Sequence, residues 1–301
     1  LMGKLTWPAV LQGPRSALMC PSPMPMIAKR TRRAALCVLL ASFIGAPIIA
    51  GAEETKTSTR VADNRPKVIV PKVIKTYPHQ RDAFTQGLLF AEGAVVESTG
   101  RYGQSRLRFL DLGSGEPINE YRFPQSIFAE GATYAHGKLI ALSYRSGRGF
   151  VFDPETLKQV DGFRYEGEGW GLTFDGEALI MSNGSPELRF LDAVTYKEKR
   201  TLTVTFNGQP IPMLNELECV EGFIWANIWQ QDFIIRIDPT TGIVDQIADL
   251  RGLYPAEDRQ LPSEHVLNGI AFNPNTGQFL VTGKNWPNIF EIALPVEKSE
   301  D

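Results

Sequence analysis

The sequence predicts an all-β fold, a five-bladed β-propeller closed by an N-terminal strand in the last blade. The 301 residues include 27 Gly and 21 Pro, which favours a protein rich in turns. Short apolar segments alternate with glycine-containing turns, and similar units begin at five positions that are 44, 40, 45 and 53 residues apart: Gln86, Glu130, Trp170, Asn215 and Asn268. Groups of short strands that recur about every 40–50 residues are typical of propeller blades.

Each repeat contains two further strands after the segment that opens it. In chain order, the expected strands are residues 95–98 and 107–111, 138–144 and 150–153, 178–182 and 188–192, 223–228 and 234–238, and 279–282 and 289–292. A β-sandwich would also contain many short strands, but it would not produce five matching repeat starts. The repeats therefore favour the propeller.

The ring needs one more strand to close. Residues 66–77 are rich in Val and Ile and belong to no repeat, whereas the fifth repeat ends near residues 292–294 with three strands at most. We predict that residues 66–77 form the outer strand of the last blade, because this leaves no open interface between the first and last blades. The propeller domain would then span residues 66–301, preceded by a flexible polar segment at residues 53–65.

The first 52 residues have the order of a secretory signal peptide. Basic side chains at residues 29–33 precede an apolar run of 17 residues, 34–50, and small residues follow at 50–52. We therefore expect residues 1–52 to be cleaved from an exported protein, either periplasmic or secreted. An uncleaved membrane anchor is the alternative, although the run is at the lower limit for spanning a bilayer.

Removal of residues 1–52 would leave an acidic chain. Six of the 31 Lys and Arg and none of the 34 Asp and Glu lie there, which leaves 25 basic side chains against 34 acidic ones, a net charge of −9. This balance argues against nucleic acid and, after signal cleavage, against a membrane as partners. Cys219 alone follows residue 52, so we expect no internal disulfide and interpret this cysteine as a small core residue. We expect a monomer.

The repeat starts carry aromatic, amide and carboxyl side chains. In a propeller the innermost strands face a central channel, so their starts meet at one mouth of that channel. The side chains that should converge there are Phe84, Gln86, Phe128, Glu130, Trp170, Asn215, Glu216 and Asn268. Such a composition suits a small pocket for a neutral polar group.

Eight motifs resemble the plant and bacterial glutaminyl-peptide cyclotransferase (glutaminyl cyclase) family. They lie in order between about residues 70 and 294: Phe84-Thr85-Gln86-Gly87-Leu88, Glu97-Ser98-Thr99-Gly100, Phe128-Ala129-Glu130-Gly131, Gly167-Glu168-Gly169-Trp170-Gly171-Leu172, Leu214-Asn215-Glu216-Leu217-Glu218, Trp225-Ala226-Asn227-Ile228-Trp229, Leu267-Asn268-Gly269-Ile270-Ala271 and Thr282-Gly283-Lys284-Asn285-Trp286-Pro287. The resemblance implies a transferase that converts the N-terminal glutamine of peptides or proteins to pyroglutamate and releases ammonia. It also implies that substrates with N-terminal Gln are the partners of this chain.

The resemblance also implies roles for individual residues. Glu130 matches the catalytic acid/base, Gln86 and Asn215 match residues that bind polar atoms of the substrate, and Lys284 matches a residue of the same site. The pocket walls match Phe84, Phe128, Trp170 and Trp229. Tyr144 stands where the family has a tryptophan, so we expect a pocket of altered shape and altered substrate preference.

Cyclisation of glutamine requires a group that can accept a proton and then donate it. The α-amine of glutamine attacks its own side-chain carboxamide, so one carboxylate between the two nitrogens can act first as base and then as acid. We assign this role to Glu130, whose pKa would be raised by burial and lowered by Lys284. The amide of Asn215 or Gln86, or an indole N–H, could donate to the developing oxyanion.

Each assignment has an ordinary alternative. Glu130 could be a solvated or capping residue, Trp170 and Trp229 could pack between blades, and Lys284 could be a surface lysine. Asn215 and Asn268 could close turns, and we favour this interpretation for Asn268.

The sequence contains no pattern of metal ligands. His79, His136 and His265 lack the spacing of a site, so we expect no cofactor in catalysis, while a structural cation in the channel stays open. Two other functions remain in view. One is a non-catalytic propeller that binds peptides or proteins, and the other is a hydrolase or lactonase with a metal in its channel.

Overall fold

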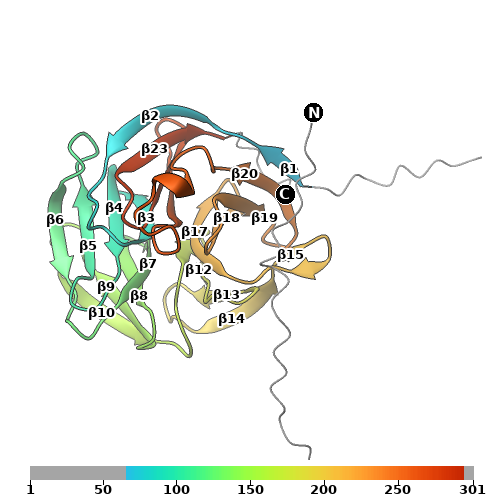
Figure 1. Ribbon diagram of the computed structural model, residues 1–301. Coiled ribbons are helices and arrows are strands. Elements are labelled where there is room, and N and C mark those ends of the chain that lie inside the picture. The colour runs from blue at the N-terminus through green and yellow to red at the C-terminus, as the bar shows by residue number, and fades with distance from the viewer. Residues whose placement is uncertain (1–65, 295–301) are drawn as a thin grey trace, which may run out of the picture. The chain divides into compact units, whose positions relative to one another are not determined.

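The computed structural model describes residues 66–294, which fold into five β-sheets arranged as the blades of a propeller (Figure 1). The first blade is β3 (Thr85–Ala91), β4 (Ala94–Thr99), β5 (Arg106–Leu110) and β6 (Pro117–Arg122). The second is β7 (Ala129–Ala135), β8 (Lys138–Ser143), β9 (Arg148–Phe152) and β10 (Gln159–Arg164). The third is β11 (Leu172–Phe174), β12 (Ala178–Met181), β13 (Glu187–Asp192) and β14 (Glu198–Thr203).

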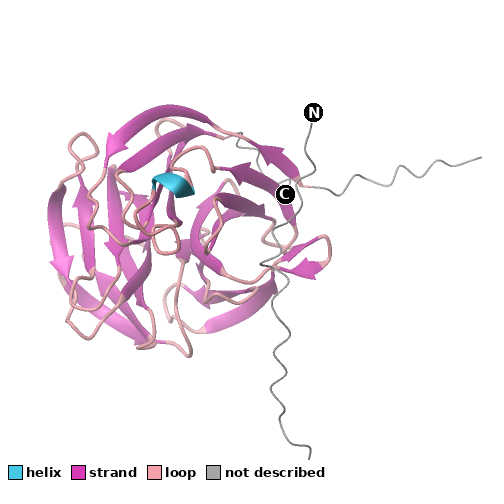
Figure 2. Cartoon of the chain, in the orientation of Figure 1, coloured by secondary structure: helices cyan, strands magenta, loops and turns pink. Residues whose placement is uncertain are grey.

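The last two blades include the N-terminal strands. The fourth is β17 (Leu214–Val220), β18 (Phe223–Ile228), β19 (Phe233–Ile237), β20 (Val244–Asp249) and β1 (Lys67–Ile69). The fifth is β21 (Leu267–Asn273), β22 (Gln278–Gly283), β23 (Asn288–Ala293) and β2 (Lys72–Pro78). A small hairpin, β15 (Thr205–Phe206) and β16 (Gln209–Pro210), and one helical turn, η2 (Ala256–Asp258), lie in the connections (Figure 2). All ten strands expected from the repeats are present, with ends within two residues of the predicted ones.

The N-terminal segment closes the ring as predicted, and it does more than predicted. β2 pairs antiparallel with β23 and supplies the outer strand of the fifth blade. β1, however, pairs in parallel with β20 of the fourth blade, so the segment spans two blades (Figure 1). Pro71 separates the two strands, and because proline lacks a backbone N–H it suits this break.

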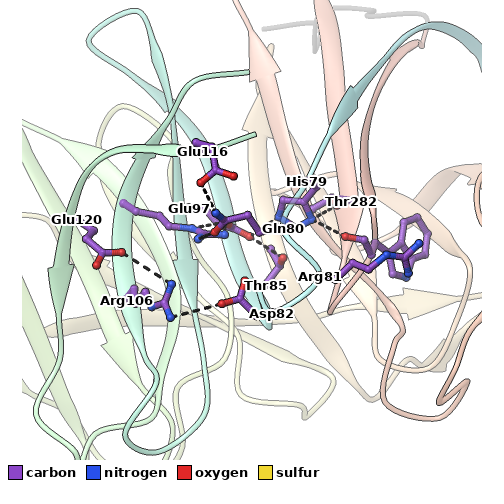
Figure 3. Close-up of polar contacts among 12 residues, drawn as sticks. His79, Gln80, Arg81, Asp82, Thr85, Glu97, Arg106, Glu116, Glu120 and Thr282 are labelled. Carbon is purple, nitrogen blue, oxygen red and sulfur yellow. Dashed lines mark hydrogen bonds and ion pairs between the residues drawn. The ribbon is translucent and has the colours of Figure 1, made fainter. Parts of the chain in front are cut away.

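A buried polar network fastens the closing segment to its neighbours. We call His79, Thr85, Glu97 and Arg108 the latch cluster, and Figure 3 shows His79 and Thr85 around Glu97. His79 follows β2, and its Nε2 lies 3.0 Å from Glu97 Oε1 on β4, which also accepts a 2.6 Å hydrogen bond from Thr85 Oγ1. Arg108 Nε donates to Glu97 Oε2 at 2.8 Å, and neither ionic side chain is exposed.

A β-bulge interrupts four of the innermost strands at the same position. The pairing with the second strand shifts between Thr85 and Gly87, Ala129 and Ala132, Leu214 and Leu217, and Leu267 and Ile270. A bulge redirects a side chain away from its place in the regular pleat. The predicted site residues Gln86, Glu130 and Asn215 lie within these bulges. Each of them therefore lies at a point where the regular strand pairing is interrupted.

Glycine directly after the bulged position lets the inner strands approach closely. A Cβ on Gly131 would lie 2.6 Å from Leu172 N in the third blade. A Cβ on Gly171 would lie 2.0 Å from the carbonyl oxygen of Asn215 in the fourth blade. Glu216 occupies the equivalent position of the fourth blade, and its carboxylate accepts hydrogen bonds from Leu88 N at 3.2 Å and Ile270 N at 2.8 Å. One glutamate thus joins the fourth blade to the first and the fifth.

The residues that the sequence assigned to export lie outside the described residues. These are the predicted signal peptide, 1–52, and the polar segment, 53–65. Between residues 66 and 294 there is no helix with the length and apolar character needed to cross a membrane.

Candidate active site

All nine side chains that the sequence analysis assigned to a site line one pocket of about 230 Å³. They come from all five blades: Phe84, Gln86, Phe128, Glu130, Tyr144, Trp170, Asn215, Trp229 and Lys284. The pocket is smaller than the roughly 300–1,000 Å³ that holds a drug-sized ligand. Its size suits a single amino-acid residue at the end of a chain.

Five aromatic rings form a continuous wall along the pocket. The centroid distances between successive rings are 6.2 Å from Phe84 to Phe128, 5.7 Å to Tyr144, 6.5 Å to Trp170 and 6.2 Å to Trp229. Most of these contacts are edge-to-face, an arrangement that aromatic pairs prefer. Tyr144, which stands where the family has a tryptophan, therefore keeps the wall unbroken.

Glu130 is buried in the wall of this pocket, with 4% of its surface exposed. Its backbone oxygen accepts a 2.6 Å hydrogen bond from Ser98 Oγ of the preceding blade, which holds the bulge in place. Burial raises the pKa of Glu130 well above its usual value, while nearby Lys284 lowers it and Glu168 raises it further. The alternative of a solvated or capping glutamate is wrong.

Lys284 is also buried, with 6% of its surface exposed, so the surface-lysine alternative is wrong. Its Nζ lies 4.9 Å from the centroid of the Phe84 ring. Burial lowers the pKa of Lys284 to about 8, against the opposing effect of Glu130, and Arg101 lowers it as well. The pocket thus pairs a carboxyl group and an amine whose pKa values have moved toward each other.

The side-chain amides are buried and differ in their bonding. Asn268 Nδ2 donates to Thr85 O at 3.0 Å and to Gln86 Oε1 at 3.3 Å, which orients the Gln86 amide. Asn268 lies in β21 and is fully buried, so its interpretation as a turn residue is wrong. Asn215 Oδ1 is buried without a hydrogen-bond partner among the described residues, and a ligand that donates to it would satisfy this oxygen.

Two residues that line the pocket were not predicted from the sequence. Ser263 and Glu264 lie in the connection between β20 and β21, which carries η2 and accounts for the 53-residue spacing before the last repeat. Glu264 Oε2 lies 3.1 Å from Arg101 Nη2, and the Arg101 guanidinium stacks 4.4 Å from the Phe84 centroid. The long spacing was the available signal that this connection holds extra structure.

The remaining reactive side chains lie elsewhere. Within residues 66–294, no three His, Cys, Asp or Glu side chains are grouped so as to hold a metal ion. His79 belongs to the latch cluster, and His136 is exposed in a turn. Burial raises the pKa of the Cys219 thiol to about 12, so this cysteine is a poor nucleophile, as expected.

The fold and the pocket together define a five-bladed propeller with a buried carboxyl group inside an aromatic box. The chain belongs to the glutamine cyclotransferase family, whose model matches residues 46–294. It is 37% identical to a glutaminyl-peptide cyclotransferase of Arabidopsis thaliana in an alignment 231 residues long, which covers 74% of this chain and 71% of that protein. It is also similar to the crystal structure of Myxococcus xanthus glutaminyl cyclase, with 38% identity, a TM-score of 0.73, and coverage of 78% of this chain and 100% of that one.

Proposed function

We propose that this chain is a glutaminyl-peptide cyclotransferase, which converts the N-terminal glutamine of peptides or proteins to pyroglutamate and releases ammonia. The observation that carries the proposal is the position of Glu130, a buried carboxyl group in a pocket sized for one residue and walled by five aromatic rings. Membership of the glutamine cyclotransferase family supports it. So do the two relatives, which bear this activity in their names.

The reaction needs little more than a fixed conformation and one proton carrier. The uncharged α-amine attacks the side-chain carbonyl carbon, a C–N bond forms, and the ionised Glu130 takes the proton that the amine loses. Glu130 then returns this proton to the departing nitrogen, the old C–N bond breaks, and ammonia leaves. The aromatic wall contributes by holding glutamine curled, which makes the intramolecular attack efficient.

The oxyanion of the tetrahedral intermediate needs a donor. Trp170 Nε1 already donates to Glu168 Oε2 at 3.0 Å, so its indole is engaged. Asn268 Nδ2 donates a hydrogen bond to Gln86 Oε1, and this leaves the Gln86 Nε2 group to donate to the ligand. The side-chain amides of Gln86 and Asn215 are therefore better candidates than this indole.

The proposal includes three finer points. Catalysis requires no metal or other cofactor, the mature chain is exported to the periplasm or beyond the cell, and it acts as a monomer. The signal-like order of residues 1–52 supports export.

The test is direct turnover. The purified protein should cyclise a Gln-initiated dipeptide, with ammonia release and a mass loss of about 17 Da, as acyl transfer with loss of ammonia requires. Glu130→Gln should lower kcat roughly a hundredfold or more, because it removes the proton carrier. Glu198→Gln, which changes an exposed carboxylate on β14, is the matched control.

Three outcomes would contradict the proposal. A folded wild-type protein without turnover would refute the enzyme and favour the peptide-binding alternative. Near-normal turnover by Glu130→Gln would move the acid/base role to another group. Loss of activity on chelation would favour the metal-dependent alternative.

A further inference from the structure

A chain of polar contacts at the edge of the pocket links two rings of its aromatic wall. Trp170 Nε1 donates to Glu168 Oε2 at 3.0 Å, and Arg145 Nε donates to Glu168 Oε1 at 2.9 Å. Arg145 Nη2 in turn donates to the Tyr144 hydroxyl at 3.0 Å, and its guanidinium lies 4.5 Å from the centroid of the Tyr144 ring. We call Arg145 and Glu168 the rim pair.

The rim pair differs from an ordinary surface ion pair. Exposed pairs contribute little, because water screens the charges and long side chains lose freedom. Here each partner also contacts an aromatic residue of the pocket, and the Tyr144 and Trp170 rings are themselves neighbours at 6.5 Å. Gly169 N donates to Tyr144 O at 3.0 Å, so the two loops are joined through the backbone as well.

The hydroxyl of Tyr144 adds a polar contact to this arrangement. An indole at this position, where the family that the chain resembles has a tryptophan, would not place a phenolic oxygen beside Arg145. The hydroxyl accepts from Arg145 and so adds a contact to a guanidinium that already binds Glu168. The departure from the family pattern and the rim pair therefore belong to one structural unit.

Glu168 of the rim pair also affects the ionisation of Glu130. Glu168 raises the pKa of Glu130, after the larger effect of burial and against the effect of Lys284. Burial raises the pKa of Tyr144 and of Tyr165, and the charge of Glu130 adds a smaller effect in the same direction. Arg145 partly offsets the charge of Glu168, since the two side chains are in direct contact.

We propose that Glu168, held by Arg145, is a positioning residue that fixes the Trp170 indole at the pocket and sets the electrostatic environment of Glu130. Neither residue of the rim pair belongs to the pocket lining, so both act through their neighbours. This inference rests on the cyclisation proposed above and adds a determinant of its pH dependence and substrate affinity.

Three substitutions separate the two roles. Glu168→Gln keeps an oxygen acceptor for the indole but removes the negative charge, so the acid limb of kcat/KM should move to lower pH. Arg145→Gln leaves the charge of Glu168 without its partner, so the same limb should move to higher pH. Each shift should be a few tenths of a pH unit, since the rim pair is partly exposed to water. Glu168→Ala also frees Trp170, which should raise KM roughly tenfold for the loss of a charged hydrogen bond.

The measurement is a pH profile of kcat and KM on a Gln-initiated dipeptide for the wild type, the three variants and the Glu198→Gln control. Opposite shifts for Glu168→Gln and Arg145→Gln, with an unshifted control, support the inference, because a purely structural role would not change the sign. Shifts in the same direction, or no shift, overturn it while wild-type turnover stands. Absence of wild-type turnover overturns the proposed function and this inference together. Should Glu168→Ala fail to fold, the two polar variants still decide.

Discussion

Replacing Glu97 by Gln should destabilise the propeller by about 3–5 kcal/mol, the cost of breaking a buried ion pair by removing one partner. Both Glu97 and Arg108 have no exposed side-chain surface, and Arg108 Nη2 lies 2.7 Å from Glu97 Oε2. The substitution would leave a buried guanidinium without a counter-ion. It would also weaken the contact of Glu97 with His79, which joins the closing segment to the first blade, and the contact with Thr85 inside that blade.

The titration of Glu97 gives an independent magnitude. Burial opposes its ionisation, but Arg108 and His79 outweigh this and hold the pKa of Glu97 at about 2, against 4.5 for the free side chain. At 1.36 kcal/mol per pKa unit, this difference corresponds to about 3 kcal/mol of stability. Because the folded-state pKa is depressed, the contribution is complete above about pH 4.5 and is lost as pH falls toward 2.

Thermal unfolding followed by circular dichroism would test both statements. For a domain of this size each kcal/mol shifts Tm by about 2–4 °C, so Glu97→Gln should lower Tm by roughly 6–20 °C at neutral pH. The Tm difference from the wild type should narrow on acidification below about pH 4.5. The double substitution of Glu97→Gln with Arg108→Met should recover part of the loss, since apolar replacement of a buried pair is often neutral. A Tm loss as small as that of Glu198→Gln would refute the reasoning.

Three further predictions concern the pocket. Lys284→Met should move the acid limb of kcat/KM to higher pH, because the lysine lowers the pKa of Glu130 and its loss makes Glu130 harder to ionise. An acid limb at the wild-type pH would show that Lys284 does not influence the ionisation of Glu130. Gly184→Ala should raise KM, since its φ of +80° disfavours a side chain and the added Cβ would lie 2.7 Å from the Trp170 ring; unchanged kinetics would contradict this contact. Asn268→Ala should raise KM roughly tenfold, as steady-state kinetics would show, because it removes the buried hydrogen bond that orients the Gln86 amide. A lower Tm with an unchanged KM would argue against that role.

The fold was predictable because its repeats carry turn and strand signals at a regular spacing. The inner strands and their partners are buried and apolar, so they stand out in the sequence. Outer strands such as β10 and β14 were not predicted, because their side chains are mostly exposed and polar. The pairing of β1 with the fourth blade also escaped prediction, since three residues carry too little pattern to specify a partner strand.

The pocket lining was predictable to the extent that it follows the repeat. Residues at repeat starts, together with the family resemblance, located all nine assigned side chains. Contacts that depend on loop conformation were not predictable, which is why Glu264 and the rim pair were missed. The role of Asn268 was misjudged because asparagine is common in turns, whereas here its amide is buried and bonded within β21.

The strand that completes the last blade is also among the first parts of the propeller to be synthesised. Lys72 pairs with Ala293, 221 residues further along the chain. At about 5–20 residues per second on the ribosome, roughly 10–45 s pass before that partner exists. During this time Val73 and Ile74, which remain half-exposed even in the finished blade, belong to an unpaired strand edge. The N-terminal strand can therefore pair only in the last step of folding. Nascent chains are most exposed to aggregation until the final blade has been made.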